Sequence, residues 1–194
     1  KFKPVAQGTL TRNKLIEKIL MGGFPEVVTE IARERRDAWF RSYVTTILQR
    51  DVRELANIEG LTAMPKMLSL LASRAGGLLN FADLSSTVGV PQTSLKRYMM
   101  LLQTTYLVHL LPPWFGNIGK RLIKTPKVYL LDSGLAAHLL DVNNQRLAND
   151  GTLLGHLAEL FVATELLKQL TVSDANAQLF FFRSQAGNEI DFVL

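Results

Sequence analysis

Apolar residues recur at helical spacing through the first third of the chain, and these repeats predict two helices. The first runs from Arg12 to about Met21, with Thr11 as its N-cap. Gly22-Gly23-Phe24-Pro25 then breaks the pattern. The second stripe covers residues 31–58 and allows an interruption near Arg36. We expect an N-terminal helical segment that spans residues 1–58.

Three shorter helical repeats follow, and two strands come after them. The helices are predicted over residues 64–75, 81–88 and 91–104, with Asn80 as the N-cap of the second and a Gly89-Val90 turn before the third. The strands are predicted over residues 106–111 and 127–131. Three helices followed by two strands and a connecting loop predict a winged helix-turn-helix over residues 59–140.

The third helix has one apolar side, and its polar side carries groups that reach bases or phosphates in DNA-binding proteins. The loop between the strands is basic and would form the wing. The candidate nucleic-acid-binding residues are Gln92, Thr93, Ser94, Lys96, Arg97, Lys120, Arg121 and Lys124. Because fold does not fix function, a winged helix that docks against another protein is the alternative interpretation.

A polar stretch, residues 141–151, follows a short helix that Asp132 or Ser133 caps and that ends near Leu140. We expect the stretch to be a loop and a domain boundary. The next helix, over about residues 153–170, is apolar nearly all round, which predicts burial. Glu159 lies within that apolar surface, where a carboxylate needs a partner. Glu165 has Lys168 one turn away, so an ordinary helical ion pair explains it.

The last fifteen residues, 180–194, predict a β-hairpin with a Gly187-Asn188 turn. Alternation places Glu189 and Asp191 on one face of the second strand and apolar side chains on the other. Two carboxylates on one face repel each other unless a cation or a basic partner lies between them. We expect Glu159 to face this acidic side of the hairpin.

Charge and composition narrow the class of protein. The 194 residues include no cysteine, which excludes disulfides and is compatible with a reducing cytoplasm. No apolar run reaches the roughly 18 residues that a membrane span requires. Residues 1–127 are basic and residues 128–194 are acidic, within a net charge of +5. This asymmetry favours a polyanion-binding surface next to a cation-holding part, although ordinary solvated surface charge explains it equally well.

Several of these motifs together resemble the C-terminal region of a group of predicted prokaryotic ATPases. In that group an AAA-type P-loop module comes first, a winged helix follows, and the last domain is similar to PD-(D/E)xK nucleases. The motifs that carry the resemblance are Gly155-x-x-x-Glu159, Glu165-Leu166, Phe182-Arg183, Gly187, Glu189-Ile190-Asp191-Phe192, Gly22-Gly23-Phe24-Pro25-Glu26, Leu48-Gln49-Arg50-Asp51 and Val128-Tyr129-Leu130-Leu131-Asp132-Ser133-Gly134-Leu135.

The resemblance implies that residues 141–194 are a partial restriction-endonuclease-like α/β domain. Together with the winged helix-turn-helix before it, this domain makes the expected fold class of the whole chain α+β and mostly helical. Glu159, Asp191 and Glu189 match its catalytic residues, and Glu159 and Asp191 would hold Mg²⁺ or Mn²⁺. The matching acid-x-Lys element would follow Leu194. The chain contains no GxxxxGK[ST], so ATP would bind only in a preceding module. Because it begins at Lys1 and stops within a predicted strand, we expect a fragment without activity of its own.

Two functional hypotheses follow from these observations. In the first, the chain is the DNA-associated part of a cytoplasmic ATPase, its partners are duplex or branched DNA and its own ATPase module, and its nuclease-like domain is incomplete. In the second, it is a non-catalytic scaffold that couples an ATPase to a protein partner. Neither hypothesis involves a membrane.

Overall fold

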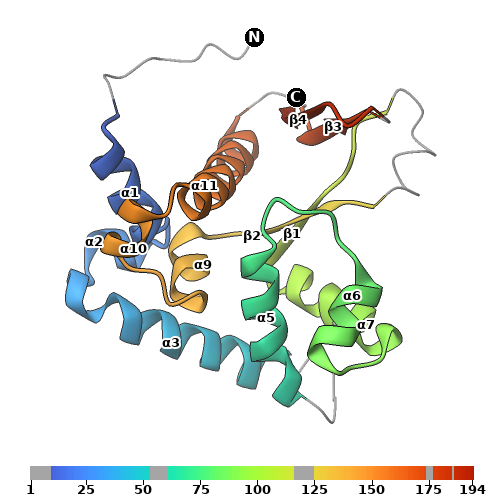
Figure 1. Cartoon of the computed structure of the whole chain (residues 1–194). Helices are drawn as coiled ribbons and strands as arrows, with labels where there is room; N and C mark the ends of the chain where they lie inside the picture. The colour runs from blue at the N-terminus through green and yellow to red at the C-terminus, as the bar shows by residue number, and fades with distance from the viewer. Residues whose placement is uncertain (1–9, 53–60, 116–124, 174–176, 185) are drawn as a thin grey trace.

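A computed structural model describes residues 10–52, 61–115, 125–173, 177–184 and 186–194. The described chain is mostly helical and contains two antiparallel two-stranded sheets, which confirms the α+β class (Figure 1). One hydrophobic core runs through it and includes buried residues of the N-terminal helices, the middle helices, the first sheet and the long C-terminal helix.

The N-terminal helices follow the predicted pattern at the start and depart from it afterwards. Helix α1 (Arg12–Met21) has the predicted bounds, and the Thr11 side chain accepts a hydrogen bond from the backbone N–H of Lys14. The helix predicted over residues 31–58 begins later than Ile31, and the interruption that the prediction allowed near Arg36 lies where a 3₁₀ turn meets the next helix. A short helix α2 (Pro25–Thr29) and a 3₁₀ turn η1 (Arg33–Arg35) precede α3 (Arg36–Thr46), which continues as a π-helical segment η2 (Ile47–Val52).

Helix α2 was missed because Pro25 was interpreted as a break. Proline is well tolerated at the first helical position, where its missing N–H has no intrahelical partner in any case. Residues 53–58 of the predicted helix lie outside the described residues.

The next three helices match the predicted order. They are α5 (Met64–Ser73), which the 3₁₀ turn η3 (Leu61–Ala63) precedes, then α6 (Phe81–Val88) and α7 (Gln92–Thr104). The Asn80 side chain caps α6 by accepting hydrogen bonds from two backbone N–H groups, and Gly89 ends the helix in the left-handed conformation at φ +79°. Pro91 is the N-cap residue of α7 and not part of its first turn.

Strands β1 (Val108–Leu111) and β2 (Lys127–Leu130) form the first sheet, with Val108 opposite Leu130. Residues 76–79 run along the other edge of β2, where Gly76 N–H donates to Val128 O over 2.9 Å and Val128 N–H donates to Gly77 O over 3.0 Å. The strand β2 therefore lies between β1 and this short segment, and its side chains are buried.

The predicted polar loop over residues 141–151 contains a helix. After α9 (Ser133–Leu139), helix α10 (Asn144–Asn149) begins with Asn143 as its N-cap and buries Leu147. This helix packs on α1 and on the long helix α11 (Gly151–Val172). One buried leucine among polar residues is too weak a periodic signal to reveal a helix of six residues from sequence.

The terminal hairpin consists of β3 (Phe180–Arg183) and β4 (Glu189–Val193). Its first strand also contacts the segment after β1, since Phe181 N–H donates to Pro112 O over 3.2 Å and Trp114 N–H donates to Phe181 O over 2.5 Å. In Figure 1 the hairpin (red) lies away from α6 and α7 (green). No helix among the described residues is long and apolar enough to cross a membrane.

Candidate functional site

Three carboxylates from two distant parts of the chain converge on one buried lysine. The Nζ atom of Lys127 lies 3.2 Å from Glu159 Oε1, 2.5 Å from Glu189 Oε1 and 2.8 Å from Asp191 Oδ1. The lysine side chain is 3% exposed. Helix α11 supplies Glu159, strand β4 supplies the other two acids, and β2 supplies the lysine. We call these four residues the Lys127 cluster.

Tyr129 adds a second donor to the cluster. Its hydroxyl donates to Glu159 Oε1 over 2.6 Å, so this carboxylate oxygen accepts from both an ammonium and a phenol. Burial raises the pKa of Tyr129, and the hydrogen bond to Glu159 raises it further. The phenol therefore keeps its proton and remains a donor at neutral pH. The ring of Phe181 covers another side of the ammonium, with its centroid 5.6 Å from Nζ.

The backbone beside the cluster is shaped by a glycine. Gly76 has φ +79°, which favours glycine, and it ends the turn after α5. A Cβ atom at this position would lie 2.7 Å from Glu159 Oε1. Gly76 therefore provides both the left-handed turn and the space that the Glu159 carboxylate occupies.

The electrostatics of the cluster keep the lysine charged. Burial alone lowers the pKa of Lys127, but its hydrogen bonds to Asp191 and Glu189 and the charge of Glu159 outweigh that effect, so the pKa is raised. Three carboxylates surround one ammonium, and Arg183 also approaches Glu189, with 3.9 Å between Nη1 and Oε2. The cluster is a partly buried ion network that joins three elements.

The structure brings together all three acids that the sequence singled out. Glu159 faces the acidic side of the hairpin as predicted, and Glu165 pairs with Lys168 as predicted. Within the hairpin, Phe192 lies near Tyr129, whereas Ile190 is 54% exposed and forms no part of an apolar contact face.

Sequence reasoning missed Lys127 as the cation between the acids. The available signal was a single charged residue at the start of the otherwise apolar run Lys127-Val128-Tyr129-Leu130. In the described structure the Lys127 ammonium occupies the point on which the carboxylate oxygens of Glu159, Glu189 and Asp191 converge. Among the described residues, no group of three or more histidines and acids is placed to hold a metal ion.

The candidate nucleic-acid-binding residues of α7 lie on its outer face. Gln92, Thr93, Lys96 and Arg97 are exposed and Ser94 is half-buried. The opposite face, with Leu95, Tyr98, Met99 and Leu102, is buried as predicted. The Lys96 ammonium lies 5.9 Å from the ring centroid of Phe81. Lys120, Arg121 and Lys124, the proposed wing residues, lie outside the described residues.

A second polar junction joins the Gly22-Gly23-Phe24-Pro25-Glu26 motif to the motif that contains Asp132 and Ser133. The Asp132 carboxylate is buried and accepts hydrogen bonds from Gly23 N–H over 2.6 Å and from Leu135 N–H over 2.8 Å. Burial raises the pKa of Asp132, and these backbone hydrogen bonds oppose the rise. Ser133 Oγ donates to Ile19 O over 3.0 Å. The first residues of α9 and its N-cap are therefore hydrogen-bonded to α1 and to the glycine turn that follows it.

Comparison with models of known protein families shows which family the chain belongs to. A family model described as a domain of unknown function, DUF8612, matches residues 12–146, and a second one, DUF4143, matches residues 154–194. Because the first match covers more than half of the sequence, the chain belongs to the DUF8612 family.

Two curated relatives are uncharacterised proteins of Mycobacterium tuberculosis (strain ATCC 25618 / H37Rv) and Mycobacterium bovis (strain ATCC BAA-935 / AF2122/97). Each is 35% identical over 175 residues, which is 90% of this chain and 39% of the relative. The chain thus spans well under half the length of these relatives. No solved structure gave a significant match.

Proposed function

We propose that this chain is a DNA-associated part of a cytoplasmic AAA-type ATPase, in which α5, α6, α7, β1 and β2 form a winged helix. The observation that carries the proposal is helix α7, which buries its apolar face and exposes a polar, basic one. Side chains of this kind on a helix of this length reach base edges and phosphates in a major groove. The ATPase connection rests on the sequence resemblance and on DUF4143, a domain found in AAA-ATPase-associated proteins.

Duplex DNA should bind the chain with an affinity that falls as salt rises. Each neutralised phosphate contributes about −0.9 to the slope of log affinity against log salt concentration. Replacing Lys96 by alanine should therefore make that slope shallower by about one unit and weaken binding at low salt. The measurement is fluorescence anisotropy with a labelled duplex over a salt series.

The matched control is Lys66→Ala, which removes an exposed lysine from α5 and not from α7. Its salt slope should equal that of the wild type. If the two lysine variants shift the slope equally, contact is diffuse and α7 is not the DNA-binding element. Absence of binding even at low salt would contradict the proposal as a whole.

The Lys127 cluster favours a second candidate function, a non-catalytic docking scaffold. The resemblance proposes a nuclease-like domain with Mg²⁺ or Mn²⁺ at Glu159 and Asp191, where the metal would polarise a phosphate and activate water. In the described structure both carboxylates bind the Lys127 ammonium instead. Lys127 links β2 to the hairpin and to α11 through these ion pairs, so its role in this candidate function is to stabilise the fold.

Mn²⁺ should therefore leave the melting temperature of the wild-type chain unchanged. It should raise that of Lys127→Ala, because three carboxylates without their ammonium attract a divalent ion. Differential scanning fluorimetry with and without Mn²⁺ measures both shifts. A further substitution, Asp191→Asn, should remove the rise seen in Lys127→Ala. A rise in the wild type that Asp191→Asn abolishes would instead support a metal-binding, nuclease-like site.

A further inference from the structure

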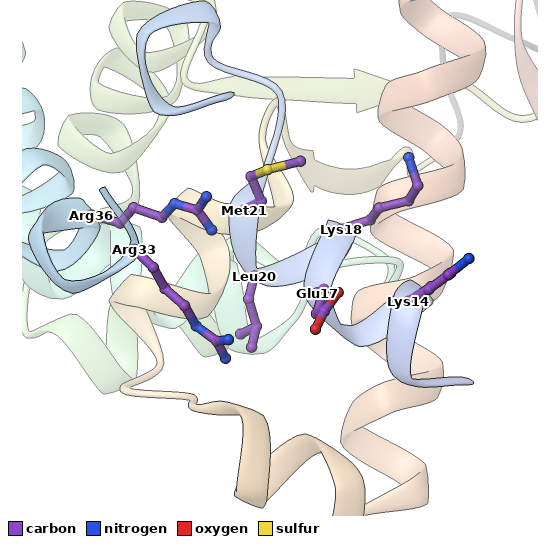
Figure 2. A pocket seen from close by; sticks show the side chains of 7 residues that line it. All are labelled: Lys14, Glu17, Lys18, Leu20, Met21, Arg33 and Arg36. Carbon is purple, nitrogen blue, oxygen red and sulfur yellow. The ribbon is translucent and has the colours of Figure 1, made fainter. Parts of the chain in front are cut away.

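A second basic site lies far from α7, in a pocket of about 480 Å³ between α1 and the start of α3. Figure 2 shows Arg33 and Arg36 on one side of it and Lys14 and Lys18 of α1 on the other. Glu17 is the acidic residue in the lining. Four cations against one carboxylate give the pocket a strongly positive character.

The rest of the described chain does not neutralise these four positive charges with ion pairs. None of the four cationic side chains forms an ion pair with another described residue, although ion pairs occur elsewhere, as between Arg41 and Asp37. Surface cations without partners are ordinary when they point singly into water. Four that line one concave site keep a positive potential there.

The Arg36 side chain supplies an independent observation. Its Nε atom is buried and has no hydrogen-bond partner, and it is the one buried side-chain nitrogen or oxygen of this kind among the described residues. A buried donor without a partner is destabilising, so native structures rarely keep one without a reason. An anion that accepts a hydrogen bond from this Nε would give it a partner and would also account for the surrounding charges.

We propose that this pocket binds a phosphate-bearing small molecule. Arginine guanidinium groups match phosphate oxygens with paired hydrogen bonds, and lysines add point charges. The volume falls within the roughly 300–1,000 Å³ typical of small-ligand sites. Leu20 and Met21 line the pocket as well and offer an apolar wall to the organic part of such a ligand.

Pyrophosphate is the probe that tests the proposal. It should bind with one-to-one stoichiometry in isothermal titration calorimetry and raise the melting temperature of the chain. Arg36→Met should weaken that binding by about tenfold or more, because a charge-assisted hydrogen bond is lost. Without pyrophosphate the same variant should be at least as stable as the wild type, because methionine removes the unpartnered donor while keeping much of the apolar volume.

The control is Arg35→Met, which removes the neighbouring exposed arginine that does not line the pocket. It should bind pyrophosphate as the wild type does. Equal loss in both variants, or no saturable binding at low salt, would overturn the proposal.

Duplex DNA provides the remaining arm, because its backbone also carries phosphates. Arg36→Met should leave DNA binding unchanged, since Figure 1 shows α1 and α7 on opposite sides of the molecule. If the variant weakens DNA and pyrophosphate binding alike, the pocket belongs to a nucleic-acid surface and not to a small-ligand site. The site does not depend on α7, so failure of either proposal leaves the other standing.

Discussion

Replacing Lys127 by methionine should lower the free energy of unfolding by about 3 kcal/mol, because removing one member of a buried ion pair leaves the others without a counter-charge. The lysine side chain is 3% exposed, whereas its partner Asp191 is 52% exposed. Because solvent reaches Asp191 and screens its charge, we expect the loss of stability to lie at the lower end of the range for buried ion pairs. Urea denaturation followed by circular dichroism measures the change.

Two variants separate loss of the ion network from loss of packing. Lys66→Met makes the same substitution at an exposed site and should change stability little. Adding Glu159→Gln to Lys127→Met removes one of the orphaned charges and should recover about 1 kcal/mol. A Lys127→Met variant as stable as the wild type would show that the ammonium does not hold the hairpin to α11.

The same comparison has a defined pH dependence. Because the folded-state pKa of Lys127 is raised above its ordinary value of 10.5, its contribution to stability is fully present below that value. The contribution is lost as pH rises through the folded pKa. The stability difference between the wild type and Lys127→Met should therefore be constant from neutral pH to about pH 10 and shrink at higher pH.

Sequence patterns predicted a structural feature correctly where the interactions that form it lie between residues close together in the chain. Thr11 and Asn80 cap helices at the predicted positions, because a cap needs only a side-chain oxygen next to free backbone N–H groups. Helix α2 was missed because Pro25 was interpreted as a break, and α10 was missed for the complementary reason. The short apolar pattern of α10 acquires meaning only from the helices on which it packs, and periodicity within six residues does not reveal those partners.

The candidate site shows the same division between local and long-range information. Glu159 was recognisable because a carboxylate in an apolar helical surface requires a partner wherever the helix packs. The identity of that partner depends on the approach of β2 to α11, between residues 32 positions apart in the chain. No pattern in the sequence specifies that approach, so a metal ion and a lysine were equally good solutions until the strand was placed.

The junction between Gly23 and Asp132 is a further long-range feature, and it requires α9 to lie close to the end of α1. A substitution at Gly134, near this junction, tests how close that approach must be. Gly134→Ala should destabilise the chain by about 3 kcal/mol, the upper part of the range for overpacking a well-packed core. A Cβ atom there would lie 2.7 Å from Phe40 Cζ, 2.8 Å from Met21 O and 2.9 Å from Gly22 N. Two of these atoms belong to backbone, which cannot move aside as a flexible side chain can.

Gly155 provides the matched control, since both glycines lie inside helices and both belong to motifs of the resemblance. A Cβ atom at Gly155 would meet no described atom within 4 Å, so Gly155→Ala should stabilise the chain by up to about 1 kcal/mol through helix propensity. Thermal denaturation of the two variants should therefore shift in opposite directions. Equal shifts would mean that α9 can withdraw from α1, and that the hydrogen bonds of Asp132 and Ser133 do not fix the distance between these helices.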